Sequence, residues 1–387
     1  MKPSVIKDQS KQGIEFKMKI GVPKEIKNHE YRVGLVPRFV RELVAKGHEV
    51  LVEKNAGIGI GMTDEDYREV GAQIAETAAE VFDWAEMIVK VKEPQPNECQ
   101  QLKEDQILFT YLHLAPDPAQ TQLLMDSGCI AIAYETVTDQ YGRLPLLTPM
   151  SEVAGRLAVQ AGAHCLEKIN GGRGVLLGGV PGVLPARVLI IGGGVSGTQS
   201  IRMALGLEAE VTVIERSIDR MRELKNQFGS RIRTVYSSSD AIEVELLKSD
   251  LVIGAVLIPG AAAPKLVTRE NMKMMQKGAV FVDVAIDQGG CAETSKPTTH
   301  SEPTYIEEDV VHYCVTNMPG AVPRTSTFAL NNATIPYIQA LAALGAEGAC
   351  RKDIGLLNGV NICRGQVTQA AVAECQDRNY VDPLSAL

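Results

Sequence analysis

The sequence lacks several features that define common classes of protein. It has no run of about 18 uninterrupted apolar residues, so no membrane-spanning helix is expected. Residues 1–17 have no apolar core of the kind that a secretory signal needs, and they are predicted to form a polar extension. A basic excess is also lacking, because 39 Lys and Arg stand against 47 Asp and Glu. The resulting net charge of −8 argues against nucleic-acid binding.

Patterns for metal binding and disulfides are lacking as well. The eight cysteines form no CxxC pair and the six histidines have no metal-ligand spacing, so no bound metal is predicted. Scattered free thiols are typical of a reducing compartment, so a cytoplasmic location is expected. With 45% hydrophobic and 22% charged residues, the composition is that of an ordinary globular protein. A chain of 387 residues predicts two or three domains.

Two series of short apolar segments alternate with helical patterns along the chain. Strands that alternate with helices predict a parallel sheet covered on both faces. The expected strands of the first series are 18–23, 48–53, 87–94, 107–113 and 131–137. The expected strands of the second series are 187–192, 210–215, 232–238, 250–256 and 279–287.

The pattern changes between the two series and again near the end of the chain. Segment 139–146 (DQYGRLPL) is a candidate hairpin turn. A long helix is expected over 151–169, capped by Ser151 and ended by Gly171-Gly172. A glycine-rich loop follows at 171–186, and the chain becomes helical again after about residue 320.

These changes predict a domain organisation with an insertion. After the extension at 1–17, a substrate domain begins at 18–150, and a nucleotide domain is inserted at 151–318. The C-terminal helices at 319–387 are expected to return to the substrate domain. The predicted fold class is α/β, with two Rossmann-like, doubly wound parallel-sheet domains and a cleft between them.

The segment VLIIGGGVSG contains a GxGxxG pattern directly after an expected strand and at the start of a helix. In this pattern Gly192 permits a tight turn, Gly194 lets the backbone approach a pyrophosphate, and Gly197 allows close helix packing. The free N–H groups at the start of the helix favour an anion. The pattern therefore predicts a dinucleotide site.

Glu215, at the end of the next expected strand, bears on which dinucleotide is bound. A carboxylate at this position accepts hydrogen bonds from the ribose hydroxyls and repels a 2′-phosphate, so NAD is favoured. Arg216 and Arg220 lie close in the sequence and could meet a 2′-phosphate. NADP therefore stays open as a weaker alternative.

Four titratable residues stand at or near expected strand ends, namely Arg32, Lys92, His113 and Asp287. Since ligands bind at the carboxyl ends of parallel strands, the first three are expected to converge on one edge of the substrate domain. Asp287 would face them from the nucleotide domain. Arg32 and Lys92 suit a substrate carboxylate and a neighbouring carbonyl or amine. His113 suits proton transfer near neutral pH, and Asp287 could orient water or an ammonium group.

Several blocks of the sequence resemble the alanine dehydrogenase family, which shares its fold with the NAD-binding subunit of transhydrogenase. These blocks cover nearly the whole chain and include EIKNHEYRVGLVP, VKVKEP, LFTYLHLA, GGRGVLLGGVPGV and VFVDVAIDQGGCAETSKPTTH. The resemblance implies a homo-hexamer that catalyses the reversible, NAD-dependent oxidative deamination of L-alanine to pyruvate and ammonium. A transhydrogenase subunit with membrane partners and a non-catalytic nucleotide-sensing protein are the alternatives.

The resemblance also implies roles for individual residues. Arg32 and Lys92 match the substrate-binding pair of the family, and His113 and Asp287 match its acid–base pair. The implied cofactor contacts are Ser151, Glu215, Arg220, Ser237, Val256, Leu257, Ile286, Asp287, Val315, Asn317 and Met318.

The sequence departs from the family pattern at a few positions. Glu215 stands where the family usually has Asp, and Arg216 stands where it has a neutral residue. Glu208-Ala209 replaces a glycine-alanine pair, and Lys296 replaces a frequent arginine. The departures at Glu215, Arg216 and Lys296 concern cofactor preference and affinity and leave the implied reaction unchanged.

Overall fold

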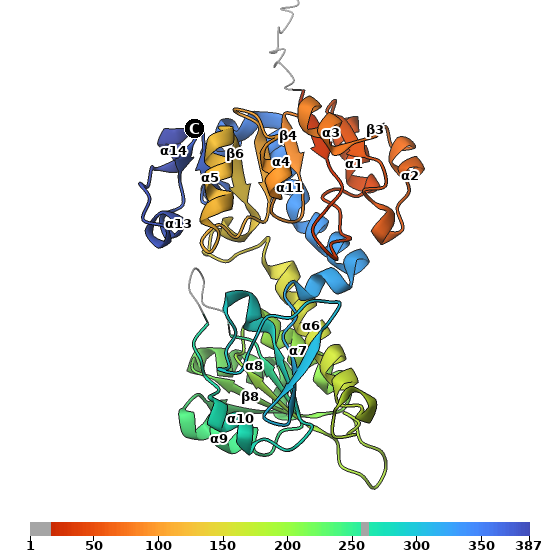
Figure 1. Ribbon diagram of the computed structural model, residues 1–387, viewed down its shortest axis with the longest axis vertical. Helices are drawn as coiled ribbons and strands as arrows, with labels where there is room; N and C mark the ends of the chain where they lie inside the picture. The colour runs from red at the N-terminus through yellow and green to blue at the C-terminus, as the bar shows by residue number, and fades with distance from the viewer. Residues whose placement is uncertain (1–16, 257–262) are drawn as a thin grey trace, which may run out of the picture. The chain divides into compact units, whose positions relative to one another are not determined.

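The computed structural model describes residues 17–256 and 263–387 (Figure 1). The chain divides into two compact units. The first contains the residues up to Glu25, Val33–Arg143 and Thr334–Leu387, and the second contains Ile26–Arg32 and Leu144–Ala333. The nucleotide domain was expected at 151–318, and the second unit is longer at both ends and includes a short early segment.

The first unit is built on an eight-stranded sheet with the order β15-β14-β6-β5-β4-β1-β2-β3. Strands β1 to β6 pair in parallel, whereas β14 runs antiparallel to both β6 and β15. The strands are β1 (Lys19–Val22), β2 (Glu49–Glu53), β3 (Gln73–Ala75), β4 (Met87–Val89), β5 (Ile107–Thr110), β6 (Ile130–Ala133), β14 (Val360–Cys363) and β15 (Gln366–Val367).

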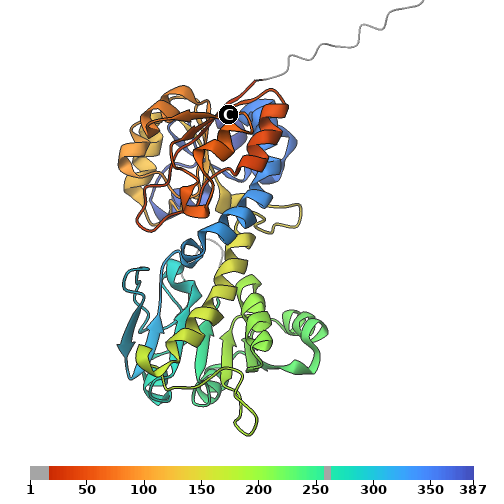
Figure 2. The ribbon, with the colours of Figure 1, turned by 90° about the vertical axis from the view of Figure 1, so that its right-hand side faces the viewer.

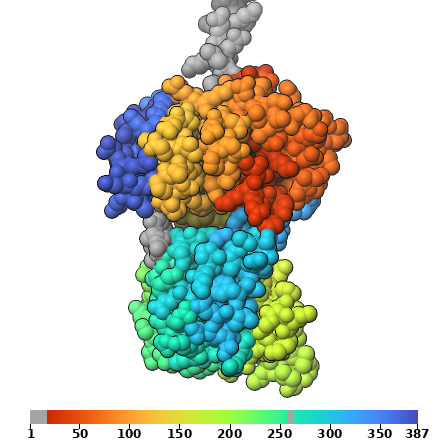
Figure 3. Space-filling model, viewed as in Figure 1, coloured from red at the N-terminus to blue at the C-terminus, as the bar shows by residue number. Residues whose placement is uncertain are grey.

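Helices of the first unit begin and end at residues with clear local signals. Asp117 caps α5 through the N–H of Gln120, and Gly128 ends that helix with a left-handed φ of 70°. Residues that follow β15 lie on the surface beside α5 (Figure 3), where Arg378 donates to Gln122. The helices are α1 (Pro37–Ala45), α2 (Asp64–Arg68), α3 (Ala78–Trp84), α4 (Pro96–Cys99), α5 (Pro118–Ser127), the part of α11 (Pro323–Lys352) from Thr334 onward, α12 (Ile354–Leu357), α13 (Ala370–Cys375) and α14 (Pro383–Ala386).

The second unit is built on a seven-stranded sheet with the order β12-β13-β11-β10-β7-β8-β9, in which only the edge strand β12 runs antiparallel. Its strands are β7 (Arg187–Ile191), β8 (Glu210–Glu215), β9 (Ile232–Tyr236), β10 (Leu251–Gly254), β11 (Val280–Asp283), β12 (Thr304–Glu307) and β13 (Val310–Tyr313). Its helices, besides the start of α11, are α6 (Thr148–Cys165), α7 (Val195–Gly206), α8 (Ile218–Phe228), α9 (Ser239–Leu246) and α10 (Arg269–Met274). The glycine-rich segment 171–186 projects from this unit as a loop (Figure 2).

Both sheets bring their parallel strands into the same spatial order. Numbered within each unit, that order is 3-2-1-4-5-6, which is the order of a doubly wound nucleotide-binding sheet. In β7, Val188 and Ile190 belong to one apolar core cluster and Leu189 and Ile191 to another. Successive side chains of a strand point to opposite faces, so both faces of this sheet are buried. The predicted α/β fold class is confirmed.

The long helix between the two strand series begins earlier than expected. Helix α6 starts at Thr148 with Pro149 in its first turn, so Ser151 lies inside it and is no cap. Proline is tolerated in the first turn because its missing N–H has no intrahelical partner there. The helix ends at Cys165, and Gly171, with φ of 87°, ends only a following 3₁₀ turn.

Two further expectations about local structure are wrong. Segment 139–146 forms a turn in which the N–H of Asp139 bonds the carbonyl of Arg143, but no described residue between 134 and 147 belongs to a strand. The C-terminal region also holds more than helices, because β14 and β15 extend the first sheet. Strand β14 has Asn361 among its four residues and β15 has only two residues, so neither forms a continuous apolar run. Among the described residues, no helix is long and apolar enough to cross a membrane.

Candidate active site

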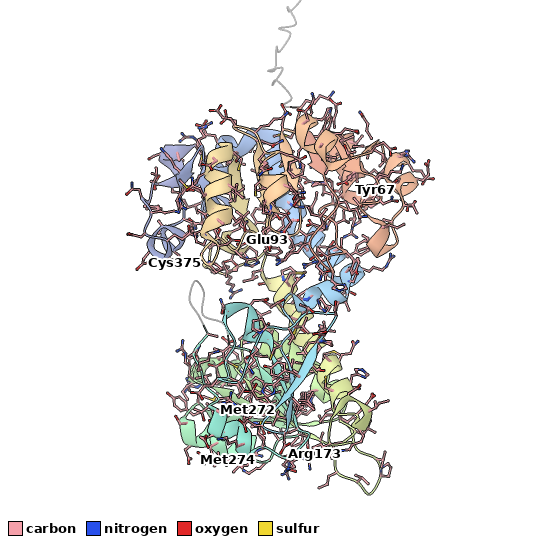
Figure 4. The ribbon with its side chains drawn as sticks, viewed as in Figure 1. Tyr67, Glu93, Arg173, Met272, Met274 and Cys375 are labelled. Atoms are coloured by element: carbon pink, nitrogen blue, oxygen red, sulfur yellow. The ribbon has the colours of Figure 1, made fainter. Side chains whose placement is uncertain are left out.

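Lys92 follows β4 at the carboxyl edge of the first sheet. It is only 9% exposed, and its Nζ lies 3.4 Å from Oε2 of Glu93, which is labelled in Figure 4. Its carbonyl accepts a hydrogen bond of 2.9 Å from the hydroxyl of Thr110 on the neighbouring strand β5. Lys92 is therefore a nearly buried cation at the edge where a doubly wound sheet binds its ligand.

His113 follows β5, the strand next to β4, and its backbone is unusual. Its φ of 53° lies in the left-handed region, which is uncommon for a residue other than glycine. The carboxylate of Glu135 accepts the N–H of His113 at 2.6 Å and that of Leu112 at 3.1 Å. The imidazole stacks on Tyr111, and the side chain is 45% exposed. Glu135 thus holds a strained turn that leaves the imidazole open to solvent.

Arg32 belongs to the second unit by its contacts, although the sequence placed it in the substrate domain. Its Nε and NH2 groups donate to the two carboxylate oxygens of Glu30, both at 2.6 Å, and NH2 also donates to Oδ1 of Asn317 at 2.8 Å. Burial raises the pKa of Glu30, but hydrogen bonds and charge from Arg32 outweigh burial and lower that pKa to about 2. Arg32 is 2% exposed, so its guanidinium is almost fully enclosed by the contacts that it makes.

Asp287 does not end a strand as expected. Strand β11 ends at Asp283, and Asp287 lies in the following 3₁₀ helix, where its side chain is exposed. Nor is β11 the last strand of this sheet, because β12 and β13 lie beyond it. The carboxylate of Asp287 accepts the N–H of Asn317 at 3.3 Å. Asn317 therefore contacts both Asp287 and Arg32.

The glycine turn adopts the geometry that its sequence pattern predicts. Gly192 has φ of 100°, and a Cβ there would lie 2.7 Å from the carbonyl oxygen of Ala255. A Cβ at Gly197 would lie 1.9 Å from the carbonyl oxygen of Gly192, so only glycine fits. At Gly194, which immediately precedes α7, a Cβ would meet open space, and no described side chain caps the helix. Its first N–H groups are thus available to an anion.

Glu215 and its arginine neighbours make several contacts beside this turn. The carboxylate accepts the N–H of Gly193 at 2.8 Å and those of Arg216 and Ser217 at 2.8 and 2.9 Å. Arg220 donates from Nε to the carbonyl of Gly193 at 2.7 Å and also bonds Thr198 and Glu223. Arg216 is exposed. Both Glu215 and Arg220 therefore hold the glycine turn itself.

The remaining predicted cofactor contacts fall into two groups around the same sheet edge. Near the glycine turn, the carbonyl of Ser151 accepts the hydroxyl of Ser196, and the N–H of Ser237 bonds the carbonyl of Glu215. Val256 follows β10 beside Gly192, whereas Leu257 lies outside the described residues. The side chains of three others are buried, so that a ligand would meet their backbone: Ile286, Val315 and Met318.

The cysteines and the potential metal ligands can also be placed within the described part of the chain. No group of three or more His, Cys, Asp and Glu side chains is placed to hold a metal ion there. All eight cysteines are free, and seven of them are buried. Burial, together with the charge of Asp283, raises the pKa of Cys291, so its thiolate is disfavoured and it acts as a packed apolar residue.

The structure thus groups the predicted residues within two sets. Lys92 and His113 follow adjacent strands of the first sheet, and Arg32, Asp287 and the glycine turn belong to the second unit. Three carboxylates that accept hydrogen bonds from Lys92, Arg32 and His113 were not predicted from the sequence: Glu25, Glu30 and Glu135. Their signal was weak, because an acidic residue near a strand end is usually a solvated one.

Two doubly wound sheets, a glycine turn that opens a helix and a carboxylate at the end of the next strand are the features of a dinucleotide-binding protein. The family models for the N-terminal and C-terminal domains of alanine dehydrogenase/PNT match residues 21–154 and 158–370. The chain belongs to the alanine dehydrogenase/PNT family. It is therefore an oxidoreductase of a family that uses a pyridine nucleotide.

Similar proteins match over nearly their whole length. An alanine dehydrogenase of Halomonas elongata is 57% identical over 370 residues, which are 96% of this chain and 100% of that protein. One from Mycolicibacterium smegmatis is 52% identical, over 94% of this chain and 98% of that protein. A solved L-alanine dehydrogenase has a TM-score of 0.90 and 52% identity, over 93% of this chain and 99% of that one. A transhydrogenase from Sinorhizobium meliloti, at 23% identity and a TM-score of 0.79, shares the fold.

Proposed function

We propose that this protein catalyses the reversible oxidative deamination of L-alanine to pyruvate and ammonium with NAD. The observation that carries the proposal is the set of competent side chains at the family's sites. A nearly buried lysine and an exposed imidazole follow adjacent strands of one sheet, and an arginine and a carboxylate share Asn317 in the other unit. A decayed, non-catalytic relative would not be expected to keep all four.

Each of these residues has a role in the proposed reaction. Arg32 and Lys92 bind the carboxylate and the neighbouring oxygen of the substrate through their charges. When bound, the nicotinamide supplies the hydride acceptor for the hydrogen on Cα. His113 takes and returns protons at its imidazole while water adds to the iminopyruvate carbon and ammonia leaves. Asp287 orients that water or the departing ammonium group.

The residues around the glycine turn fit the dinucleotide that the family implies. Gly194 offers open space and uncapped N–H groups for the pyrophosphate. The charge of Glu215, whose carboxylate lies 2.8 Å from the N–H of Gly193, would repel a 2′-phosphate. NAD is therefore the proposed cofactor, with NADP as a weaker substitute.

One assay tests the proposed function directly. The purified protein is mixed with pyruvate, ammonium and NADH, and oxidation of NADH is followed by absorbance. We expect turnover that stops when either pyruvate or ammonium is left out. Tight binding of NADH without turnover would instead favour a nucleotide-sensing protein or a transhydrogenase subunit.

Replacing Arg32 with lysine should raise the KM for pyruvate although the charge is kept. The guanidinium fork donates to both carboxylate oxygens of Glu30, to Asn317 and to the sulfur of Met150, and one ammonium group cannot reproduce that planar arrangement. We expect at least about a tenfold rise, which corresponds to about 1.4 kcal/mol. Steady-state kinetics at saturating NADH measure it, and an unchanged KM would contradict the role of Arg32.

Cofactor preference should depend on Glu215 and Arg216 in opposite directions. In Glu215→Ala the kcat/KM for NADPH should rise, because the repulsion of the 2′-phosphate is lost. In the double variant with Arg216→Ala the gain should disappear, because the exposed guanidinium no longer meets the phosphate. The kcat/KM values for NADH and NADPH in the wild type and both variants decide the matter. Equal NADPH use by the two variants would show that Arg216 points elsewhere.

We also propose that the protein assembles as a homo-hexamer, as the resemblance implies. Segment 171–186 supports self-association, because Leu176, Val183 and Leu184 are 67%, 63% and 82% exposed. Exposed apolar side chains of this size that lie together mark surfaces that a partner covers. Light scattering coupled to size-exclusion chromatography tests the proposed oligomeric state.

The cytoplasmic location expected from the sequence stays a prediction.

A further inference from the structure

A cluster of three buried charges lies in the first unit, next to Lys92 in the sequence. Nζ of Lys90 donates to Oε1 of Glu98 at 2.7 Å and to Oε2 of Glu25 at 3.2 Å, and none of these side chains is more than 2% exposed. Burial alone would lower the pKa of Lys90, but the two carboxylates outweigh it and raise that pKa. Lys90 therefore stays charged, and its ammonium group binds two buried carboxylates, which is not so for the nearby Lys92.

The two carboxylates of this cluster differ in what else they contact. The second oxygen of Glu98 accepts the N–H of Gln95 at 2.8 Å, at the start of α4. Oε1 of Glu25 instead accepts the N–H of Val91 at 2.6 Å and that of Lys92 at 3.4 Å. Glu25 alone thus connects the buried charges to the backbone that carries Lys92.

The backbone from residue 90 to 92 is held at every polar group, largely by side chains. The N–H of Lys90 and the carbonyl of Val91 bond the backbone of β5 and the residue after it. Tyr134 donates its hydroxyl to the carbonyl of Lys90 at 2.9 Å, and Thr110 donates to that of Lys92 at 2.9 Å. Glu25 accepts the remaining two N–H groups. Each hydrogen bond therefore fixes where this segment lies.

Residues 90–92 lie at the place in the first sheet where a ligand is expected to bind. Strand β1 lies between β2 and β4, so the strand order changes direction between β1 and β4. A doubly wound sheet binds its ligand at the carboxyl ends of the strands at this point. Glu25 follows β1 and Lys92 follows β4, so Glu25 joins the two segments that border the expected ligand position.

We propose that Glu25 is a positioning residue that fixes Lys92 for the substrate carboxylate, and that Lys90 is its buried counter-charge. This inference rests on the proposed function, in which Lys92 binds that carboxylate. Burying charged groups is costly, so a cluster like this contributes little net stability and is better explained by the geometry that it imposes. Loss of the charge of Glu25 should weaken substrate binding more than it slows the bound complex.

The test compares two substitutions in the same cluster. Glu25→Gln and Glu98→Gln each remove one carboxylate from Lys90, and only Glu25 contacts the backbone of residues 91 and 92. We expect Glu25→Gln to raise the KM for pyruvate about tenfold, with kcat within about twofold, because a charge-assisted hydrogen bond is weakened. Glu98→Gln should lower the melting temperature by about as much as Glu25→Gln does, but it should leave the KM for pyruvate unchanged.

The outcomes separate this inference from the proposed function. A wild-type protein that does not turn over pyruvate and ammonium contradicts the proposed function. With an active wild type, an unchanged KM in Glu25→Gln, or an equal rise in both variants, overturns the positioning role. Should Glu25→Gln fail to fold, the nearly isosteric Thr110→Val removes another bond to this segment. Thr110→Val should raise the KM for pyruvate at least threefold. The control is Thr121→Val, which changes another buried threonine of this unit and should leave that KM unchanged. Equal KM values in these two variants would overturn the inference.

Discussion

His113→Ala is expected to lower kcat for pyruvate amination by at least about a hundredfold while NADH still binds. Proton transfer by a positioned side chain contributes about 10²–10⁴ in rate, and alanine offers no group to replace the imidazole. The side chain is 45% exposed and is not part of the glycine turn, so cofactor affinity should be kept. Stopped-flow turnover and fluorescence titration with NADH measure the two quantities separately.

A second histidine gives the control for this substitution. His164 on α6 is 68% exposed, and its imidazole contacts Glu167 and Asn170 at the surface. His164→Ala should change neither kcat nor the affinity for NADH. If His113→Ala kept more than about a tenth of the wild-type kcat, a loss of less than about 1.4 kcal/mol, the acid–base assignment would be wrong.

Gly197→Ala is expected to abolish measurable NADH binding and to destabilise the second unit. The new Cβ would lie 1.9 Å from the carbonyl oxygen of Gly192, so the glycine turn and α7 must move apart. Overpacking of this kind costs about 1–3 kcal/mol, and the displaced N–H groups no longer meet the pyrophosphate. Calorimetry with NADH and thermal unfolding measure the two effects.

Gly206, the last residue of the same helix, provides the matched control. A Cβ there would meet nothing within 4 Å, so Gly206→Ala should keep NADH binding. Its free energy of unfolding should stay equal or rise slightly, because alanine is favoured over glycine in a helix by up to about 1 kcal/mol. NADH binding by Gly197→Ala at wild-type affinity would show that the close approach at this turn is not needed for the cofactor.

Much of the fold could be predicted because its signals are local. Short segments in which apolar residues dominate mark β1, β5, β7 and β8, and the order of strands and helices then determines a doubly wound sheet. Strands β14 and β15 were not predicted because Asn361 interrupts the apolar residues of β14 and β15 has only two residues. Both also pair antiparallel at the sheet edge, far from β6 in sequence. The start of α6 was misplaced because Ser151 and Thr148 are both plausible first-turn residues.

The sequence by itself determined the glycine turn and the identity of the ionisable groups. The GxGxxG pattern is recognisable from its own six residues, and the close approach of Gly197 to the carbonyl of Gly192 lies inside it. The same holds for the carboxylate of Glu215, which ends the next strand and returns to the N–H of Gly193. Local geometry is sufficient where the interacting groups are close in the chain.

Only the tertiary structure decided which of these groups are bound to one another. In VKVKEP, two lysines look alike, but packing against Glu25 and Glu98 buries Lys90 completely, whereas Lys92 stays 9% exposed. Arg32 joins the second unit because Asn317, 285 positions away in sequence, accepts its NH2 group. Burial, and pairing between distant residues, depend on how the whole chain folds, and no short pattern contains that information.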